Sequence, residues 1–295
     1  MSELVVGFLG LGQQGRPIAE RLASSYQVLA YDPVLEPGSD GHPFEVLADL
    51  QSVIRSTDVV FFCLPNPTVS LEVSREVAAV TDRRATLIVE LSTIGPKTSR
   101  ECCEIIRGSG LAYVDCPVSG GVVPAQNGTM TTMLAGADAD LAVVKPLLST
   151  FSNNIFEMGS EPSLGQVMKV TNNVITATSM AVTSEAVLCG VSLGLDMSTM
   201  VDVLNVSTGR TSASEDKFPQ AVIPRNFNYG ATGATVNKDV GLFLEAAGLA
   251  GSPIGLSQAT KDFWNRYVQA HPTRDFTQVY EYLEDVREGR ATETD

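Results

Sequence analysis

The sequence predicts an α/β fold, in which a doubly wound, mainly parallel sheet precedes one long helix and an all-helical region. Short apolar runs alternate with helical patterns through the first half of the chain. A single long apolar helical pattern then fills Leu164–Leu193, and the remainder to about Arg287 is helical in pattern. Strands and helices that alternate at this spacing form right-handed βαβ units and therefore a parallel sheet.

The individual elements are expected where apolar runs meet turn residues. The predicted strands are Leu4–Leu9, Gln27–Tyr31, Val59–Leu64, Thr86–Leu91, Leu111–Val114, Met130–Leu134 and Asn154–Glu157. The predicted helices between them are Arg16–Ser24, Phe44–Arg55, Val69–Ala79, Pro96–Gly108 and Ala139–Phe151. We expect the long helix to end at Gly194, and the later helices to be broken at Gly230–Gly233 and Ser252–Gly255.

Composition narrows the class of protein. The net charge of −14 disfavours binding to nucleic acid or to an anionic membrane surface. The apolar stretch Leu164–Leu195 contains Lys169 and Glu185, and its charge-free runs are shorter than the roughly 20 residues of a membrane span. Five cysteines without metal-like spacing, and a start without a basic segment, predict reduced thiols, a cytoplasmic location and no metal site.

A glycine pattern lies between the first strand and the first helix. Gly10, Gly12 and Gly15 form GxGxxG, and a second strand ends at Asp32, about 20 residues further on. Gly10 suits a tight turn, Gly12 a close backbone approach to a pyrophosphate, and Gly15 close packing of helix on strand. We therefore predict a dinucleotide-binding turn formed by Gly10, Leu11, Gly12, Gln13, Gln14 and Gly15.

Asp32 predicts which dinucleotide is bound. A carboxylate at the end of the second strand accepts hydrogen bonds from the adenosine ribose hydroxyls and repels a 2′-phosphate. An NADP site would favour Arg or Lys here, whereas Pro33, Val34 and Leu35 follow. The sequence therefore favours NAD over NADP, with a solvated turn residue as the structural alternative.

Lys169 is the candidate for proton transfer. The only two histidines, His42 and His271, lie beside prolines in loop-like contexts. Lys169 is the sole cation of the long apolar helix, and Asn172 and Asn173 follow it on the same helical face. A lysine partly removed from water has a lowered pKa and can exchange a proton with a hydroxyl or carbonyl oxygen.

The residues alone do not decide the roles of two further segments. The turn Ser119-Gly120-Gly121 could present N–H groups and a hydroxyl to a carboxylate, although an ordinary loop is the simpler interpretation. Lys238-Asp239 could be a solvated ion pair, or a cation that reaches a substrate cleft.

Several separated motifs, in order, resemble the β-hydroxyacid dehydrogenase family, which includes 3-hydroxyisobutyrate dehydrogenase and tartronate semialdehyde reductase. The motifs are Gly7 to Gly12, Cys63-Leu64-Pro65-Asn66, Leu91-Ser92-Thr93-Ile94, Asp115 to Gly121, Gly128-Thr129, Gly165 to Asn173 and Lys238-Asp239. This resemblance covers nearly the whole chain. Gln14, in place of a usual methionine, and Pro124, in place of a common glycine, depart from the family pattern.

The resemblance implies a domain layout and a set of site residues. It implies a Rossmann-type NAD-binding domain (residues 1–162), an interdomain helix (163–194), an all-α substrate and dimerisation domain (195–288) similar to that of 6-phosphogluconate dehydrogenase, and a polar tail (289–295). The active site is expected in the cleft between the domains. Lys169 matches the catalytic lysine, Asn173 its partner, and Ser119, Gly120 and Gly121 the carboxylate loop. The family positions that line the nicotinamide side of the cofactor correspond to Leu64, Pro65, Thr93 and Lys238. Asn66, which follows Pro65, is expected in the same cofactor site.

The function that we expect is reversible oxidation of a small β-hydroxy acid to its semialdehyde or keto acid with NAD. The alternatives are an NADPH-linked reductase of glyoxylate or succinic semialdehyde, an imine reductase, or a non-catalytic dinucleotide sensor or scaffold. Retention of Lys169 argues against the imine reductases and a chromatin-associated reader, in which that lysine is replaced. The apolar surface of the helical region predicts a homodimer or homotetramer.

Overall fold

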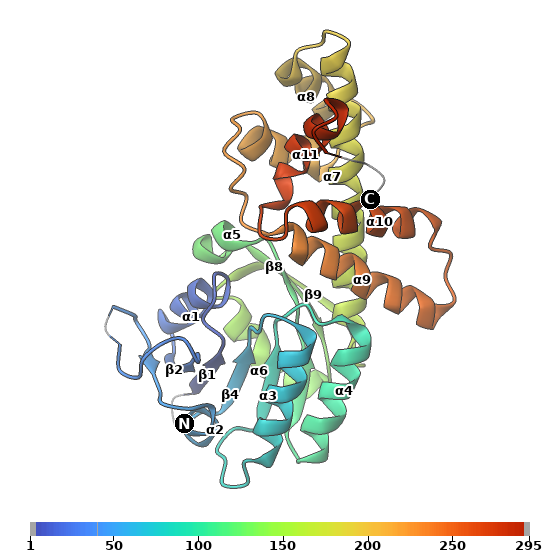
Figure 1. Cartoon of the computed structure of the whole chain (residues 1–295). Helices are drawn as coiled ribbons and strands as arrows, with labels where there is room; N and C mark the ends of the chain where they lie inside the picture. Colours follow the sequence, from blue (N-terminus) through green and yellow to red (C-terminus); the bar gives the residue numbers. More distant parts are fainter. Residues whose placement is uncertain (1–3, 40, 292–295) are drawn as a thin grey trace. The chain divides into compact units, whose positions relative to one another are not determined.

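The computed structural model describes residues 4–39 and 41–291 (Figure 1). The chain forms two compact units, one up to Lys169 and one from Val170 onward. The first is an α/β unit and the second is helical, as the sequence predicts. The boundary between the units falls inside the long helix, and the finer division at 162, 194 and 288 stays a prediction.

Among the described residues, nine strands of the first unit form one sheet, in the order β3-β2-β1-β4-β5-β6-β8-β7, with β9 paired to β8. Strands β1 to β6 pair in parallel, whereas β8 runs antiparallel to β6 and β7. The strands are β1 (Val5–Leu9), β2 (Gln27–Tyr31), β3 (Glu45–Val46), β4 (Val59–Phe62), β5 (Leu87–Glu90), β6 (Ala112–Asp115), β7 (Val118–Ser119), β8 (Met130–Ala135) and β9 (Ser152–Gly159). The two-residue strands β3 and β7 carry too little periodicity for the sequence to have predicted them.

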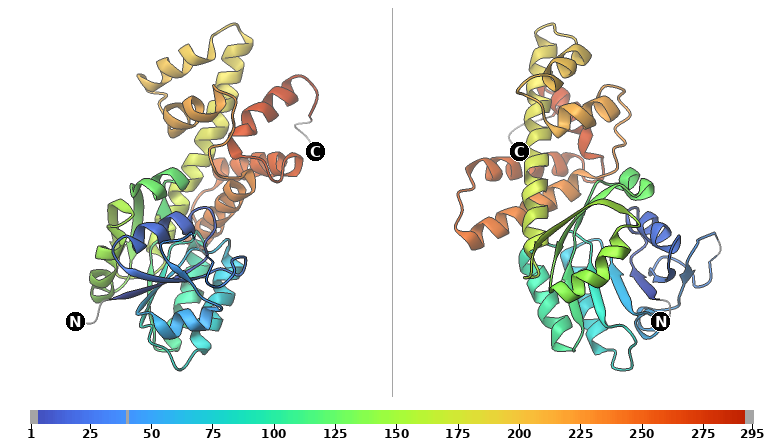
Figure 2. Two further views of the ribbon diagram at one scale, coloured as in Figure 1. Left: turned by 90° about the vertical axis from the view of Figure 1, so that its left-hand side faces the viewer. Right: turned by 180° about the vertical axis from the view of Figure 1, so that it is seen from behind.

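Helices cover both faces of this sheet, as the views in Figure 2 show. They are α1 (Gly15–Ala23), α2 (Leu50–Ser56), α3 (Pro67–Ala79), α4 (Gly95–Gly108), α5 (Val122–Asn127) and α6 (Asp138–Leu148). The prediction of a helix from Phe44 was wrong, because Glu45 and Val46 join the sheet and the Asp49 side chain caps α2 by accepting from Ser52 N at 2.6 Å. The short helix α5 was also missed.

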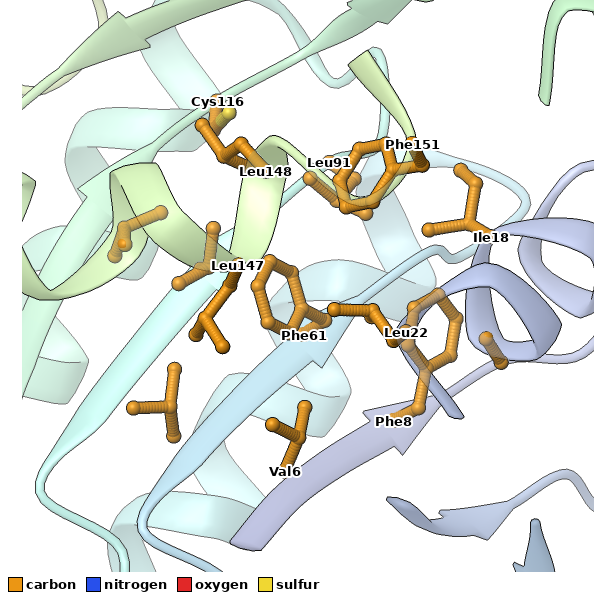
Figure 3. Close-up of a cluster of buried hydrophobic side chains, with 14 of the residues drawn as sticks. Val6, Phe8, Ile18, Leu22, Phe61, Leu91, Cys116, Leu147, Leu148 and Phe151 are labelled. Carbon is orange, nitrogen blue, oxygen red and sulfur yellow. The ribbon is translucent and has the colours of Figure 1, made fainter. Parts of the chain in front are cut away.

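Alternating side chains divide the apolar core between the two faces. Phe8 and Phe61 pack with Ile18 and Leu22 of α1 and with Leu147 of α6 (Figure 3). The intervening strand positions pack against α2, α3 and α4 on the other face. Burial on both sides is why these strands appear in the sequence as continuous apolar runs.

The second unit packs around one tryptophan. Trp264 is fully buried and donates from its ring nitrogen to Ala177 O at 3.2 Å. After α7 (Leu164–Ser192) come α8 (Met197–Asn205), the π-helical segment η1 (Ala213–Val222), α9 (Gly233–Ala250), α10 (Gly255–Ala270), the 3-10 turn η2 (Phe276–Gln278) and α11 (Val279–Arg287). The breaks predicted at 230–233 and 252–255 are confirmed.

Helix α7 is long and apolar enough to cross a membrane by length and composition alone, with a mean hydropathy of 1.5 in its most apolar window. A single helix of this kind is weak evidence, because the core helix of a soluble protein passes the same test. In this window 44% of the residues are buried inside the protein.

Candidate functional site

The glycine turn joins β1 to α1, and its three glycines serve different purposes. A Cβ on Gly15 would lie 2.1 Å from Gly10 O, and one on Gly10 would lie 2.3 Å from Cys63 O. Both positions therefore exclude a larger residue for reasons of packing. A Cβ on Gly12 would meet no atom of the described residues within 4 Å. Gly12 thus borders open space, which is where a bound phosphate would need the backbone to be bare.

The start of α1 provides groups that can bind an anion. Within the described residues, the Gln14 side chain caps no backbone N–H of α1, and the first turn has no acidic side chain. The positive dipole end of the helix therefore lies at this turn without a competing carboxylate, although the N–H of Arg16 is donated to Gly12 O at 3.1 Å. A hollow of about 490 Å³ adjoins this turn and is lined by Leu11, Gly12, Gln13, Arg16, Pro17, Glu20 and Gln126. Arg16, which was not predicted from the sequence, lines this hollow and forms an exposed ion pair with Glu20 at 3.0 Å.

Asp32 fastens the glycine turn to the end of β2. Its carboxylate accepts from Leu11 N at 2.7 Å and from Val34 N at 2.9 Å, one bond to each oxygen. An ionised carboxylate offers about four acceptor positions, so two remain for a ribose diol. Asp32 therefore has a structural role that the sequence did not reveal, and that role leaves room for the predicted one.

Predicted site residues follow the carboxyl ends of neighbouring parallel strands. Leu64 comes after β4, and its N–H donates to Ser92 Oγ, just after β5, at 2.7 Å. Asn66 caps α3 by accepting from Val69 N at 3.0 Å. Ligands of doubly wound sheets bind at this edge. The predicted contacts of Leu64, Pro65, Asn66 and Thr93 with the cofactor stay predictions.

Two buried acids lie at the ends of adjacent strands; of these, Asp115 was named from the sequence only as the start of the motif that ends at Gly121, and Glu90 was not named. Glu90 and Asp115 are paired in the register of β5 and β6, and both are fully buried. Burial raises the pKa of Glu90 to about 8 and that of Asp115 to about 6. Hydrogen bonds from Gln166 and Ser163 oppose the rise for Asp115. The sequence feature that could have indicated Glu90 is its position as a charged residue at the end of an apolar strand.

The loop that is predicted to bind the substrate carboxylate is a turn with exposed backbone. Ser119 ends β7 and is half-buried, while Gly120 and Gly121 are exposed and have φ of 141° and 83°. A Cβ on Gly120 would lie 2.8 Å from the Pro124 side chain. Pro124, the departure from the family pattern, therefore packs onto the turn that it follows.

Lys169 and Asn173 lie four residues apart in α7. Lys169 is only 8% exposed, as expected for a lysine of an apolar helix. Asn173 donates to Asp239 Oδ2 at 2.6 Å, and Asn172 donates to Asn173 Oδ1 at 3.0 Å. Asp239 thus orients Asn173, a role that the sequence does not indicate.

Lys238 forms an ion pair with Asp239 at 2.8 Å within the helical unit. The Asp239 side chain is 10% exposed and that of Lys238 is 27% exposed, so this pair is more buried than the solvated pair that the sequence left open. The structure thus links Asn172, Asn173, Asp239 and Lys238 in one polar chain. In residues 4–39 and 41–291, no group of three or more His, Cys, Asp or Glu side chains could hold a metal ion.

The glycine turn, the start of α1 without an acidic side chain in its first turn, and Asp32 define the class as a dinucleotide-binding α/β protein. Two family models match the chain. The model described as the NAD-binding domain of 6-phosphogluconate dehydrogenase covers residues 5–159. The model described as the NAD-binding of NADP-dependent 3-hydroxyisobutyrate dehydrogenase covers residues 163–283.

Named relatives and solved structures agree with these matches. The mitochondrial 3-hydroxyisobutyrate dehydrogenase of Rattus norvegicus is 30% identical over 96% of this chain and 88% of its own. The 2-(hydroxymethyl)glutarate dehydrogenase of Eubacterium barkeri is 30% identical over 88% of this chain and 87% of its own. The 3-hydroxyisobutyrate dehydrogenase of Mycobacterium tuberculosis, solved with L-serine, superposes with a TM-score of 0.85 at 28% identity, and covers 95% of this chain and 99% of its own.

This chain belongs to the β-hydroxyacid dehydrogenase family. Its named relatives are dehydrogenases, which supports an oxidoreductase that uses a nicotinamide dinucleotide. An imine reductase from Pseudomonas, with a TM-score of 0.62 at 13% identity, shares the fold alone.

Proposed function

We propose that this chain is an NAD-dependent dehydrogenase that interconverts a small β-hydroxy acid and its semialdehyde or keto acid. The observation that carries the proposal is Lys169, a lysine that is 8% exposed in an apolar helix, with Asn173 one helical turn later. The amine of a lysine can accept and return a proton, which is the capacity that general acid–base work on a hydroxyl or carbonyl oxygen requires. The family's hydroxy-acid dehydrogenases support the same reaction class.

The residues of the glycine turn fit a dinucleotide cofactor. The open space at Gly12 and the uncapped start of α1 suit its pyrophosphate, and the free acceptor positions of Asp32 suit its ribose. Bound NAD would supply the hydride acceptor. We prefer NAD to NADP because a carboxylate at Asp32 repels a 2′-phosphate, although one matching model is named for an NADP-dependent enzyme.

The chain's own groups have the following roles in the proposed reaction. The N–H groups and hydroxyl of Ser119, Gly120 and Gly121 bind the substrate carboxylate. In the oxidative direction Lys169 Nζ accepts the proton of the substrate hydroxyl, and in the reductive direction it returns that proton to the carbonyl oxygen. Asn173, oriented by Asp239 at 2.6 Å, holds the substrate oxygen in position. Leu64, Pro65, Asn66, Thr93 and Lys238 are proposed to contact the cofactor.

Substitution of Lys169 tests the proposal. Lys169→Ala should lower kcat for oxidation of 3-hydroxyisobutyrate or 2-(hydroxymethyl)glutarate by about a hundredfold or more, while the Kd for NAD changes little. Exchange of a second lysine of the α/β unit, Lys145→Ala, serves as the control, because Lys145 is paired with Glu157 on the surface at 2.6 Å. Turnover of Lys169→Ala near that of the native chain would refute the assignment of Lys169.

A cytoplasmic location and assembly as a homodimer or homotetramer are proposals of the same kind. Both rest on composition and apolar surface. Size measurement in solution would test the assembly.

A further inference from the structure

The Gln166 side chain is a fully buried amide one helical turn before Lys169. Its oxygen accepts from Ile94 N at 3.0 Å and from Gly95 N at 3.1 Å. Its nitrogen donates to Ser92 O and to Asp115 Oδ1, both at 2.9 Å. These four bonds use both donors and both acceptor positions of the amide. Gln166 therefore ties the first turn of α7 to the segment after β5, which carries Thr93.

Asp115 holds the same turn from the end of β6. Its Oδ2 accepts from Ser163 N at 3.1 Å and from Gln166 N at 2.9 Å, so a buried carboxylate satisfies N–H groups at the start of α7. Ser163 is itself held at a φ of 89°, a conformation that persists only when its surroundings enforce it. The start of the helix is thus set by side chains of the sheet.

The helix backbone also lies directly against the sheet at Gly165. A Cβ on Gly165 would lie 2.3 Å from Met133 O and 3.0 Å from Asp115 Oδ2. Any larger residue would push the first turn of α7 away from β8 and from Asp115. Three features, at Ser163, Gly165 and Gln166, therefore determine where the next turn, with Lys169, begins.

We infer that Gln166 and Asp115 are positioning residues for the Lys169 amine; this inference rests on the proposed role of Lys169. The two residues fix the helical turn from which Lys169 extends, and Gln166 couples that turn to the segment with Thr93. A misplacement of a reacting group by about 1 Å lowers turnover by about a hundredfold. Loss of the Gln166 bonds should therefore lower kcat more than the loss of stability alone would explain.

A purely structural role is the alternative, and a matched variant separates the two. Thr57 is also fully buried in the same unit, and its hydroxyl donates to Val53 O at 2.8 Å. Gln166→Met removes four buried hydrogen bonds and Thr57→Val removes one, and each keeps the approximate side-chain volume, so kcat is compared together with the free energy of unfolding of each variant. Each variant is assayed as the full chain with NAD and with 3-hydroxyisobutyrate or 2-(hydroxymethyl)glutarate, whichever the native chain oxidises faster.

We expect Gln166→Met to lower kcat by about tenfold or more, with the Kd for NAD within about threefold of the native value. Thr57→Val should leave kcat within about twofold. A Gln166→Met enzyme with native kcat, or a Thr57→Val enzyme with an equal loss, would overturn the inference. If Lys169→Ala is inactive while Gln166→Met is normal, only the positioning role fails; an active Lys169→Ala enzyme instead refutes the proposed function.

An exchange of partners provides a second test that does not depend on the folding of Gln166→Met. Gln166→Glu alone replaces the amide donor of the 2.9 Å bond to Asp115 Oδ1 by a second carboxyl group and removes the donor to Ser92 O, so kcat should fall. Adding Asp115→Asn restores a donor to that contact and keeps an acceptor for Ser163 N and for the N–H of residue 166. We expect the kcat of the double variant to be at least about threefold higher than that of Gln166→Glu alone. A double variant no faster than Gln166→Glu would contradict the inference.

Discussion

Glu90 is predicted to make the protein less stable as the pH rises, the opposite of the usual effect of a carboxylate. Its side chain is fully buried, and its Oε1 accepts from Ser92 N at 2.8 Å. Burial raises its pKa from 4.5 to about 8, so the folded chain prefers the protonated form. In the unfolded chain the group ionises near 4.5. Stability is therefore fully present below about pH 4.5 and is lost as the pH rises to about 8.

The size of the effect follows from the two pKa values. Each pKa unit of difference between the folded and unfolded chain corresponds to about 1.4 kcal/mol of the free energy of unfolding. The full loss of stability therefore has an upper limit of about 5 kcal/mol, of which about 3 kcal/mol has occurred at pH 7. Glu90→Gln keeps the acceptor for Ser92 N and cannot ionise. We expect this variant to be more stable than the native chain at pH 7 to 8, and to lose that advantage at pH 5.

Urea unfolding of both chains at pH 5, 7 and 8 measures the difference. Glu104→Gln, in which an exposed glutamate of α4 is replaced, is the control and should follow the native curve. If the native chain and Glu90→Gln show the same dependence on pH, then burial does not hold Glu90 in its protonated form and the predicted loss of stability is wrong.

Two further predictions concern the cofactor turn. Gly12→Ala should leave the free energy of unfolding within about 1 kcal/mol of the native value but raise the Kd for NAD about tenfold. Gly15→Ala should also destabilise the chain, because its Cβ would lie 2.1 Å from Gly10 O. Equal effects of the two substitutions on both the free energy of unfolding and the Kd would refute the distinction. Asp32→Asn keeps an acceptor for the bond to Leu11 N and removes the negative charge. The ratio of kcat/KM for NAD to kcat/KM for NADP should therefore fall by about tenfold. An unchanged ratio would show that Asp32 does not select the cofactor.

The parts that could be predicted from sequence are those set by local rules. Apolar runs place β1, β2 and β4 to within two residues, because strands buried on both faces leave few polar positions. The glycine spacing predicts the turn, since Gly10 and Gly15 are required by contacts of that turn itself and of the adjoining strand. The helix from Phe44 was predicted wrongly, because pairing of Glu45 and Val46 with β2 is a contact between segments that the local pattern does not contain.

The second roles of site residues could not be predicted, because they depend on partners distant in sequence. Asp32 supports the backbone of Leu11, and Asn173 is oriented by Asp239, 66 residues away. Nothing near Gln166 in the sequence indicates that Ser92, Ile94 and Asp115 surround its side chain.

By itself, the sequence determined the α/β class, the glycine turn with its acidic residue and the lysine in an apolar helix. Each of these is specified by residues close together in the chain, whose spacing is set by strand and helix geometry. Only the tertiary structure decided that Glu90 is buried beside Asp115, and that Asp115 and Gln166 hold the helical turn before Lys169. Burial and hydrogen-bond satisfaction depend on which strands become neighbours, and that depends on the fold of the whole unit.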